Sequence, residues 1–318
     1  MTALLTLDHL YLLTGAALLA VAALACADRA NPRRWSSGLF WALWAVIYLA
    51  GDVLPAVVNG LIVLMLAALG GLGGVSLGRH GTRSVEQRQA SAARHGNRLF
   101  LPILAISATA LAGSLTLKDV SAFGHLLVDP KSVTLASVGL GALVGLAAAL
   151  WMTRERPMQV LHESRRLLEI MGPAVILPQM LATLGLLFTD AGVGRAVAAI
   201  ATQTLPVDSA WLAAAAYGLG MAAFTMVMGN AFAAFPVMTA GIGIPILVGL
   251  HHGNPAVMAA IGMFCGYCGT LMTPMAANFN VIPAALLELK DRNAVIRAQW
   301  PTALMLLAVN IVLLRVFM

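Results

Sequence analysis

The feature that most limits the fold of this chain is a series of long apolar stretches that contain almost no charged residues. They lie at about 10–27, 35–51, 54–75, 99–117, 132–152 and 168–188. A helix needs about 20 consecutive apolar residues to cross a bilayer. Only 10% of the residues are charged, whereas ordinary soluble domains contain roughly 25%. The sequence therefore predicts an all-α polytopic membrane protein and excludes a water-soluble fold.

The basic residues are distributed unevenly among the segments that connect these stretches. Twelve arginines lie in the connections 28–34, 76–98 and 153–167, whereas the intervening connections contain only Lys118 and Lys131. Basic connections stay on the cytoplasmic side of a membrane. We therefore expect a multi-pass protein of the bacterial cytoplasmic (inner) membrane with its N-terminus outside. The basic residues are not interleaved with aromatic residues on a solvated surface, so no nucleic-acid partner is expected.

Short patterns that match motifs of soluble enzymes lie in segments that do not provide the structure these motifs require. Gly74, Ser76 and Gly78 fit the G-x-S-x-G pattern, but they end a predicted membrane helix instead of a strand-to-helix turn. Cys265 and Cys268 have C-x-x-C spacing inside an apolar run, which favours small buried residues. No P-loop and no H-E-x-x-H motif is present. We therefore expect neither an enzyme nor a cofactor.

The second half of the chain is rich in residues that break helices. Between residues 170 and 287 only Asp190, Arg195 and Asp208 are charged, but glycine, proline, asparagine and threonine are frequent. Two apolar runs, 226–236 and 269–283, are interrupted in this way. Broken helices persist at membrane depth only where they face protein or a water-filled cavity, and their ends can bind ions and anionic solutes. The sequence therefore predicts two broken helices that line a binding site.

We expect nine residues to contribute to this substrate or ion site: Asp190, Thr225, Gly229, Asn230, Gly269, Thr270, Thr273, Asn278 and Asn280. For Asn230 the alternative is a polar contact between helices. For each member of the 270–280 cluster the alternative is capping of a half-helix.

A third irregular piece separates two apolar arms at about 170–188 and 196–206. The second arm is short for a membrane span, which favours a re-entrant hairpin. Asp190 and Arg195 would then lie at or near the tip of this hairpin. They would form a buried pair at membrane depth, or would be solvated if the tip reaches water.

The order of three segments resembles the C-terminal half of ion transporter superfamily carriers, such as the gluconate and C4-dicarboxylate permeases. The segments are LLFTDAGVGRAV at 186–197, MGNAFAA at 228–234 and GTLMTPMAAN at 269–278. In those carriers a re-entrant hairpin and a broken helix meet at a carboxylate site. The resemblance implies an ion transporter superfamily-like fold with about 9–10 transmembrane segments.

Along its whole length the chain is similar to a bacterial family of permeases of about this size. The matching stretches are RRLLEIMGPAVILPQMLA at 165–182 and GYCGTLMTPMAANFNVIPAA at 266–285. Members of that family are assigned, with a smaller membrane partner, as a two-subunit 5-oxoproline transporter. The resemblance implies a membrane subunit of a secondary transporter for a small organic carboxylate, most simply 5-oxoproline, with Na⁺ or H⁺ as the coupling ion.

One departure from the superfamily pattern predicts a partner. Such carriers usually contain two inverted units of hairpin and broken helix, but residues 1–165 show only regular spans. We therefore expect residues 1–165 to serve as a scaffold or oligomerisation region and residues 166–318 to be the transport region. A second membrane subunit, a homo-oligomer or both would supply the missing unit within the lipid bilayer. The alternatives are a carrier of another organic acid, a non-transporting scaffold subunit and an intramembrane enzyme.

Overall fold

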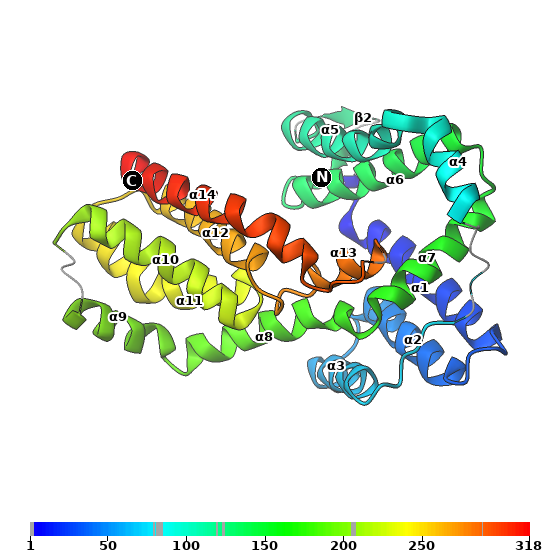
Figure 1. The fold of residues 1–318 in the computed structure, drawn as a ribbon, viewed down its shortest axis with the longest axis horizontal. Helices are drawn as coiled ribbons and strands as arrows, with labels where there is room; N and C mark the ends of the chain where they lie inside the picture. Colours follow the sequence, from blue (N-terminus) through cyan, green and yellow to red (C-terminus); the bar gives the residue numbers. More distant parts are fainter. Residues whose placement is uncertain are drawn as a thin grey trace. The chain divides into compact units, whose positions relative to one another are not determined.

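The fold is almost entirely helical (Figure 1). The computed structural model describes residues 3–78, 80, 85–118, 120–122, 125–204, 208–287 and 289–318. Contacts divide the chain into two compact units, Met1–Gly172 and Pro173–Met318. The roles that the sequence analysis assigns to residues 1–165 and 166–318 stay predictions.

Within the described residues, six helices are long and apolar enough to cross a membrane. They are Leu7–Ala27, Gln89–Thr116, Val133–Thr153, Ala210–Met228, Ala231–Leu250 and Ala294–Phe317. Two shorter apolar helices, Ala56–Gly71 and Pro255–Leu271, accompany them. These findings support an all-α, multi-pass membrane protein, as predicted, while the number of 9–10 segments stays a prediction.

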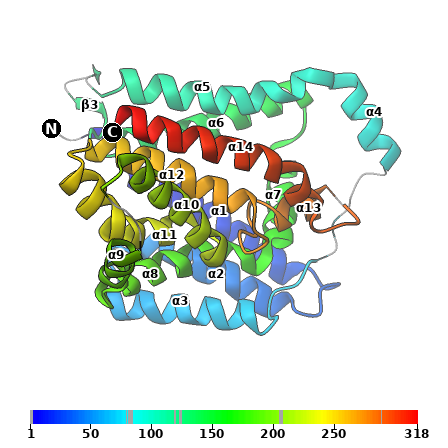
Figure 2. The same ribbon diagram turned by 60° about the vertical axis from the view of Figure 1, so that its left-hand side comes forward.

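The first unit consists of helices that pack mainly in pairs. Helix α1 packs against α2, and α5 lies side by side with α6 (Figure 1, Figure 2). Gly141 lets α6 approach α5, because a Cβ atom there would lie 2.6 Å from the carbonyl oxygen of Ile106. The elements are α1 (Leu7–Ala27), α2 (Arg34–Ala50), α3 (Ala56–Gly71), α4 (Val85–His95), η1 (Gly96–Phe100), α5 (Leu101–Thr116), α6 (Val133–Thr153) and α7 (Pro157–Met171).

A small sheet that the sequence analysis did not predict joins the N-terminal segment to the connection between α5 and α6. Strand β1 (Ala3–Leu5) pairs in parallel with β3 (His125–Val128), and β2 (Ser121–Ala122) pairs antiparallel with β3. Strands of two to four residues are too short to give a period-two pattern in the sequence. The pairing places the N-terminal segment and this connection at the same end of the unit.

The second unit has a core made of small and flexible apolar side chains. Tyr217, Met221, Met238, Leu247 and Met258 are fully or almost fully buried where α10, η3, α12 and α14 meet. The elements are η2 (Gly172–Ile176), which begins at the last residue of the first unit, then α8 (Leu177–Asp190), α9 (Val193–Thr204), α10 (Ala210–Met228), α11 (Ala231–Met238), the π-helix η3 (Thr239–Leu250), α12 (Pro255–Leu271), α13 (Val281–Leu286) and α14 (Ala294–Phe317).

The predicted span at 168–188 is wrong as one continuous helix, because the chain is interrupted at residues 172–176, near its start. Helix α7 ends at Met171, and Gly172 follows with a φ of 50°. A residue with this φ cannot continue a right-handed helix, and Pro173 lacks the amide hydrogen that a helix interior requires. The apolar run is therefore divided between α7 and α8.

The predicted re-entrant hairpin is also wrong, because its two arms do not fold back on each other. Gly185 of α8 packs against Ala233 of α11, and Gly194 of α9 packs against Ala240 of η3. Both arms therefore run in one direction along α11 and η3, with a bend at Gly192, whose φ is 72° (Figure 1). The glycines at the contacts let both arms approach the same neighbour closely.

Candidate functional site

The two breaks predicted from the sequence come together in the second unit. A Cβ atom on Gly229 would lie 2.6 Å from the carbonyl oxygen of Met275, so the two backbones touch. The Thr273 hydroxyl donates a hydrogen bond to the carbonyl oxygen of Met226 at 2.8 Å. The segment after α12 is thus fixed against the junction of α10 and α11. We call these residues, 225–230 and 269–280, the break cluster.

The first break is a tight turn in which Gly229 ends α10 and Asn230 begins α11. Gly229 follows α10 with a φ of 74°, a conformation that favours glycine. Asn230 is extended, and its Oδ1 accepts a hydrogen bond of 2.7 Å from the Phe232 amide. Asn230 is therefore the N-cap of α11. The capping alternative accounts for its Oδ1, and a ligand role for Asn230 stays a prediction.

The second break is held by a buried asparagine. The Nδ2 of Asn280 donates hydrogen bonds to the carbonyl oxygens of Thr270 at 2.8 Å and Thr273 at 2.7 Å. The Thr270 carbonyl belongs to the last turn of α12, where a helix leaves its last acceptors without partners, and Thr273 lies two positions after the helix ends. The Thr270 hydroxyl in turn donates to the carbonyl oxygen of Tyr267. Asn280 therefore replaces the hydrogen bonds that α12 loses when it ends.

Two oxygen atoms of the break cluster are buried without a hydrogen-bond donor among the described residues. They are Oγ1 of Thr225 and Oδ1 of Asn280, and both side chains are fully buried. Buried polar atoms almost always have a partner, so such atoms need an explanation. Uncharged oxygens of this kind suit an alkali cation or a hydrogen-bond donor better than a transition metal. We therefore treat these two oxygen atoms as the candidate ligand-binding atoms of the break cluster.

The break cluster is recessed from one end of the second unit. Helix α12 has 17 residues and spans about 25 Å, whereas the 24 residues of α14 span about 36 Å. Asn310 of α14 lies 3.7 Å from the Cys268 sulfur, so residues 294–309 of α14 continue past this level. The hydrocarbon core is about 30 Å thick. This geometry is consistent with a cluster that lies inside the membrane.

Two of the predicted site residues lie apart from these contacts. Asp190 is exposed at the end of α8, next to a bend that packs near Ala240, ten positions after Asn230 in the sequence. The structure therefore does not bring Asp190 into the break cluster, and its exposure does not support the predicted buried pair with Arg195. Asn278 is also exposed, although it belongs to the irregular segment itself.

A buried ionic cluster in the first unit was not predicted from the sequence. Arg165 of α7 pairs with Asp28 through Nη2 and with Glu169 through Nε, both at 2.6 Å. The other oxygen of Glu169 accepts the Gly78 amide at 2.7 Å and lies 2.9 Å from Nε2 of His80. Burial alone lowers the pKa of Arg165, but the hydrogen bonds to Asp28 and Glu169 raise it above its ordinary value.

One feature of the sequence indicates this cluster, namely the spacing of a basic and an acidic residue in α7. Glu169 follows Arg165 by four positions, a spacing that places both on one face of a helix. The prediction of orientation used Arg165 only as one of the basic residues of the connection 153–167. Its burial depends on Asp28, which is 137 positions away in the sequence. The cluster joins three connections that are all predicted to be cytoplasmic.

The capping role of Asn280 gives a prediction for stability. Asn280→Ala removes two hydrogen bonds and leaves buried carbonyl oxygens unsatisfied, so we expect the free energy of unfolding to fall by about 1–3 kcal/mol. Thermal unfolding in detergent, followed by size-exclusion chromatography, measures this effect. The matched control is Asn278→Ala, which changes an exposed asparagine of the same segment. Equal stability of the two variants would contradict the capping role.

Comparison with known proteins identifies the family. The family described as "Protein of unknown function (DUF979)" matches residues 8–318, so the chain belongs to this family. The comparison with curated proteins finds no match, and neither does the comparison with solved structures.

Proposed function

We propose that this member of the DUF979 family is a membrane subunit of a secondary transporter for a small organic carboxylate. The observation that supports the proposal is the meeting of two helix breaks, at Gly229–Asn230 and at 272–280, in a recessed position of an apolar helical unit. The resemblance of the sequence to two-subunit permeases indicates 5-oxoproline as the substrate. Neither break contains lysine or arginine. This composition fits a monoanion that is bound by backbone dipoles.

The proposed binding mode follows from the ends of the helices. Helix α11 begins at the break, and the first amides of a helix carry partial positive charge and lack acceptors within the helix. They suit the carboxylate of the substrate. The free oxygens of Thr225 and Asn280 suit a coupling Na⁺ or a proton-bearing group. Asp190 and Asn278 belong to the proposal as residues that become part of the site only when the protein changes conformation.

The proposed complex contains a second component. Among the described residues, the paired helix breaks lie in the second unit, so we propose that a smaller membrane subunit, a second copy of this chain or both complete the transporter. The complex would lie in the bacterial cytoplasmic membrane. Reconstitution with and without the smaller subunit distinguishes these arrangements.

The orientation of the chain can be tested at two exposed positions. In the structure Asn31 and Ser76 share a hydrogen bond of 2.6 Å, which joins two basic connections, and β1 joins the N-terminal segment to the connection that contains Lys131. We therefore expect Glu86→Cys to react with an impermeant maleimide only after cells are permeabilised. Lys131→Cys should react in intact cells. The reverse labelling would contradict an N-terminus outside. Both variants are made in a chain whose three native cysteines are replaced by serine.

Counterflow in proteoliposomes tests transport itself. We expect radiolabelled 5-oxoproline to enter vesicles that contain the complex, with a rate that depends on Na⁺ or pH. Asn230→Ala and Asn278→Ala should each reduce this rate at least about tenfold, which corresponds to about 1.4 kcal/mol. The control is Asn293→Ala, because Asn293 is exposed outside the break cluster.

Other outcomes of the same experiment identify the alternative functions. Unchanged uptake by both variants at equal expression would favour a scaffold subunit. Counterflow with a different organic acid but not with 5-oxoproline would retain the transporter and replace its substrate. Chemical conversion of a candidate substrate in detergent, without any gradient, would favour an intramembrane enzyme.

A further inference from the structure

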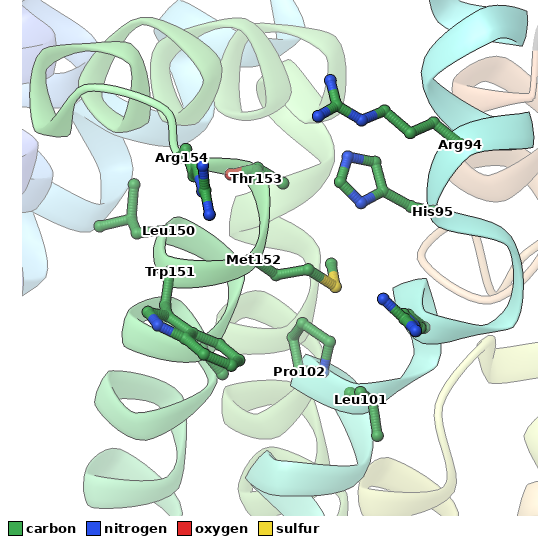
Figure 3. A pocket seen from close by; sticks show the side chains of 11 residues that line it. Arg94, His95, Leu101, Pro102, Leu150, Trp151, Met152, Thr153 and Arg154 are labelled. Carbon is green, nitrogen blue, oxygen red and sulfur yellow. The ribbon is translucent and has the colours of Figure 1, made fainter.

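A large open cavity lies in the first unit, whereas the break cluster belongs to the second unit. Its volume is about 900 Å³, and it lies between α4, η1, the start of α5 and the end of α6. Arg94 and His95 point into it from α4, and Arg154 approaches from the end of α6 (Figure 3). Arg98 also lines the cavity. The basic part of the lining therefore carries three guanidinium groups and an imidazole, which come from α4 and η1 and from the end of α6.

The rest of the lining of this cavity is mainly apolar. Leu101 and Pro102 begin α5, and Trp151 lies near the end of α6 (Figure 3). Trp151 is 83% exposed and Leu101 is 55% exposed. Tryptophan at the end of a membrane span is typical of the boundary between lipid tails and headgroups. The cavity therefore opens toward the region that lipid would occupy, and its basic residues lie at the start of the candidate span Gln89–Thr116 and just after Val133–Thr153.

The chemistry of the lining selects the kind of ligand. Guanidinium groups bind phosphate oxygens through paired hydrogen bonds, and an imidazole can add another donor. A soluble anion would use only the basic part of this lining. The apolar part and the position of the cavity at the ends of two candidate spans match a molecule with a phosphate headgroup and acyl chains.

We propose that this cavity is a binding site for an anionic phospholipid of the cytoplasmic leaflet. Arg94, Arg98 and Arg154 bind the headgroup phosphate, and the acyl chains lie along Leu101 and Trp151. A lipid bound there links the α4 and η1 segment to the end of α6, and so it stabilises the first unit. The site is distinct from the break cluster and does not depend on the transported substrate.

The carboxylate nearest to the cavity does not occupy the basic part of its lining. Glu155 lines a separate, smaller cavity of about 370 Å³ that it shares with Arg94 and His95. Glu155 also takes part in an interaction within the chain, so it is not a free carboxylate. The larger cavity is lined by no aspartate or glutamate among the described residues. The basic residues of the lining therefore suit an anion that comes from outside the chain.

Lipid titration of the purified full chain tests the proposal. Native mass spectrometry counts bound lipids in detergent, and thermal unfolding measures the stabilisation that they give. We expect phosphatidylglycerol to bind at least about ten times more tightly than phosphatidylcholine, because only the former has a net negative headgroup. The variant R94Q/R98Q/R154Q should lose this preference. The charge-matched control is K131Q/K290Q/R292Q, which removes three exposed positive charges elsewhere and should bind like the unchanged chain.

Two further arms separate the lipid from a soluble phosphate and from misfolding. Inorganic phosphate and glycerol 3-phosphate should not raise the unfolding temperature at concentrations where phosphatidylglycerol does. Equal stabilisation by these soluble anions would overturn the lipid assignment. The single variants R94Q and W151A test the basic and the apolar part of the lining without removing three charges at once, and each should weaken phosphatidylglycerol binding. Retention of the lipid preference by the triple variant would overturn the site itself.

Discussion

Arg165→Met is expected to lower the free energy of unfolding by about 3–5 kcal/mol, because it leaves buried carboxylates without their cation. Arg165 and Glu169 are 6% and 4% exposed, and Arg165 also holds Asp28 at 2.6 Å. Methionine preserves the length and apolar contacts of the side chain, so the effect reports the lost charge. We expect little folded protein to survive extraction in detergent. Unfolding in mixed micelles, followed by circular dichroism, gives the magnitude.

The neighbouring arginine provides a matched control for this variant. Arg166 pairs with Glu163 at 2.7 Å on the same helix, but these side chains are 31% and 43% exposed. Such exposed pairs contribute about 0.2–1 kcal/mol, so Arg166→Met should have a small effect. Similar losses in the two variants would contradict a special role for the buried cluster.

A double variant separates the buried charge from a general disturbance of α7. In Arg165→Met/Glu169→Leu the unpaired Glu169 carboxylate is removed together with its partner. Replacing a buried ion pair by apolar residues is often nearly neutral. We therefore expect the double variant to lose less stability than the sum of the two single variants, and an additive loss would contradict direct coupling.

The regular apolar helices could be predicted because a long run of apolar residues is enough to indicate each of them. Five of the predicted stretches coincide with α1, α2, α3, α5 and α6, with ends within a few residues, and α1, α5 and α6 belong to helices that are long and apolar enough to cross a membrane. Burial of Cys265 and Cys268 also followed from their apolar surroundings and is confirmed. Neither prediction required knowledge of which helices are neighbours in space.

The errors concern properties that depend on distant contacts. The sequence marked a break near Gly192, but the direction in which α9 leaves it depends on the contact of Gly194 with Ala240. The break cluster was predicted as a group because Gly229, Asn230 and the 270–280 segment all carry helix-breaking residues. The structural role of each residue was not predictable from the sequence. Asn280, for example, donates hydrogen bonds to carbonyl oxygens that are ten and seven positions away. Arg165 was missed because its partner Asp28 lies in another connection.

Gly229→Ala is expected to destabilise the break cluster strongly, because the added methyl group meets both an unfavourable backbone conformation and a backbone neighbour. A φ of 74° costs an alanine about 1–2 kcal/mol. The added Cβ would also lie 2.6 Å from the carbonyl oxygen of Met275, and such overpacking costs about 1–3 kcal/mol. The backbone carbonyl cannot rotate away as a flexible side chain would. We therefore expect a loss of about 2–5 kcal/mol in stability, measured by unfolding in mixed micelles.

Gly60→Ala is the matched control, because it adds the same methyl group where there is space. Gly60 lies inside α3, and nothing is within 4 Å of its added Cβ. Alanine favours the helix over glycine by up to about 1 kcal/mol, so this variant should be as stable as the unchanged chain or slightly more stable. Under the transporter proposal, counterflow by Gly229→Ala should fall further than its loss of folded protein explains, because the two breaks would be pushed apart. Normal stability of Gly229→Ala would show that the 229–230 turn and the 272–280 segment are not in contact, and the binding site proposed between them would then have no structural basis.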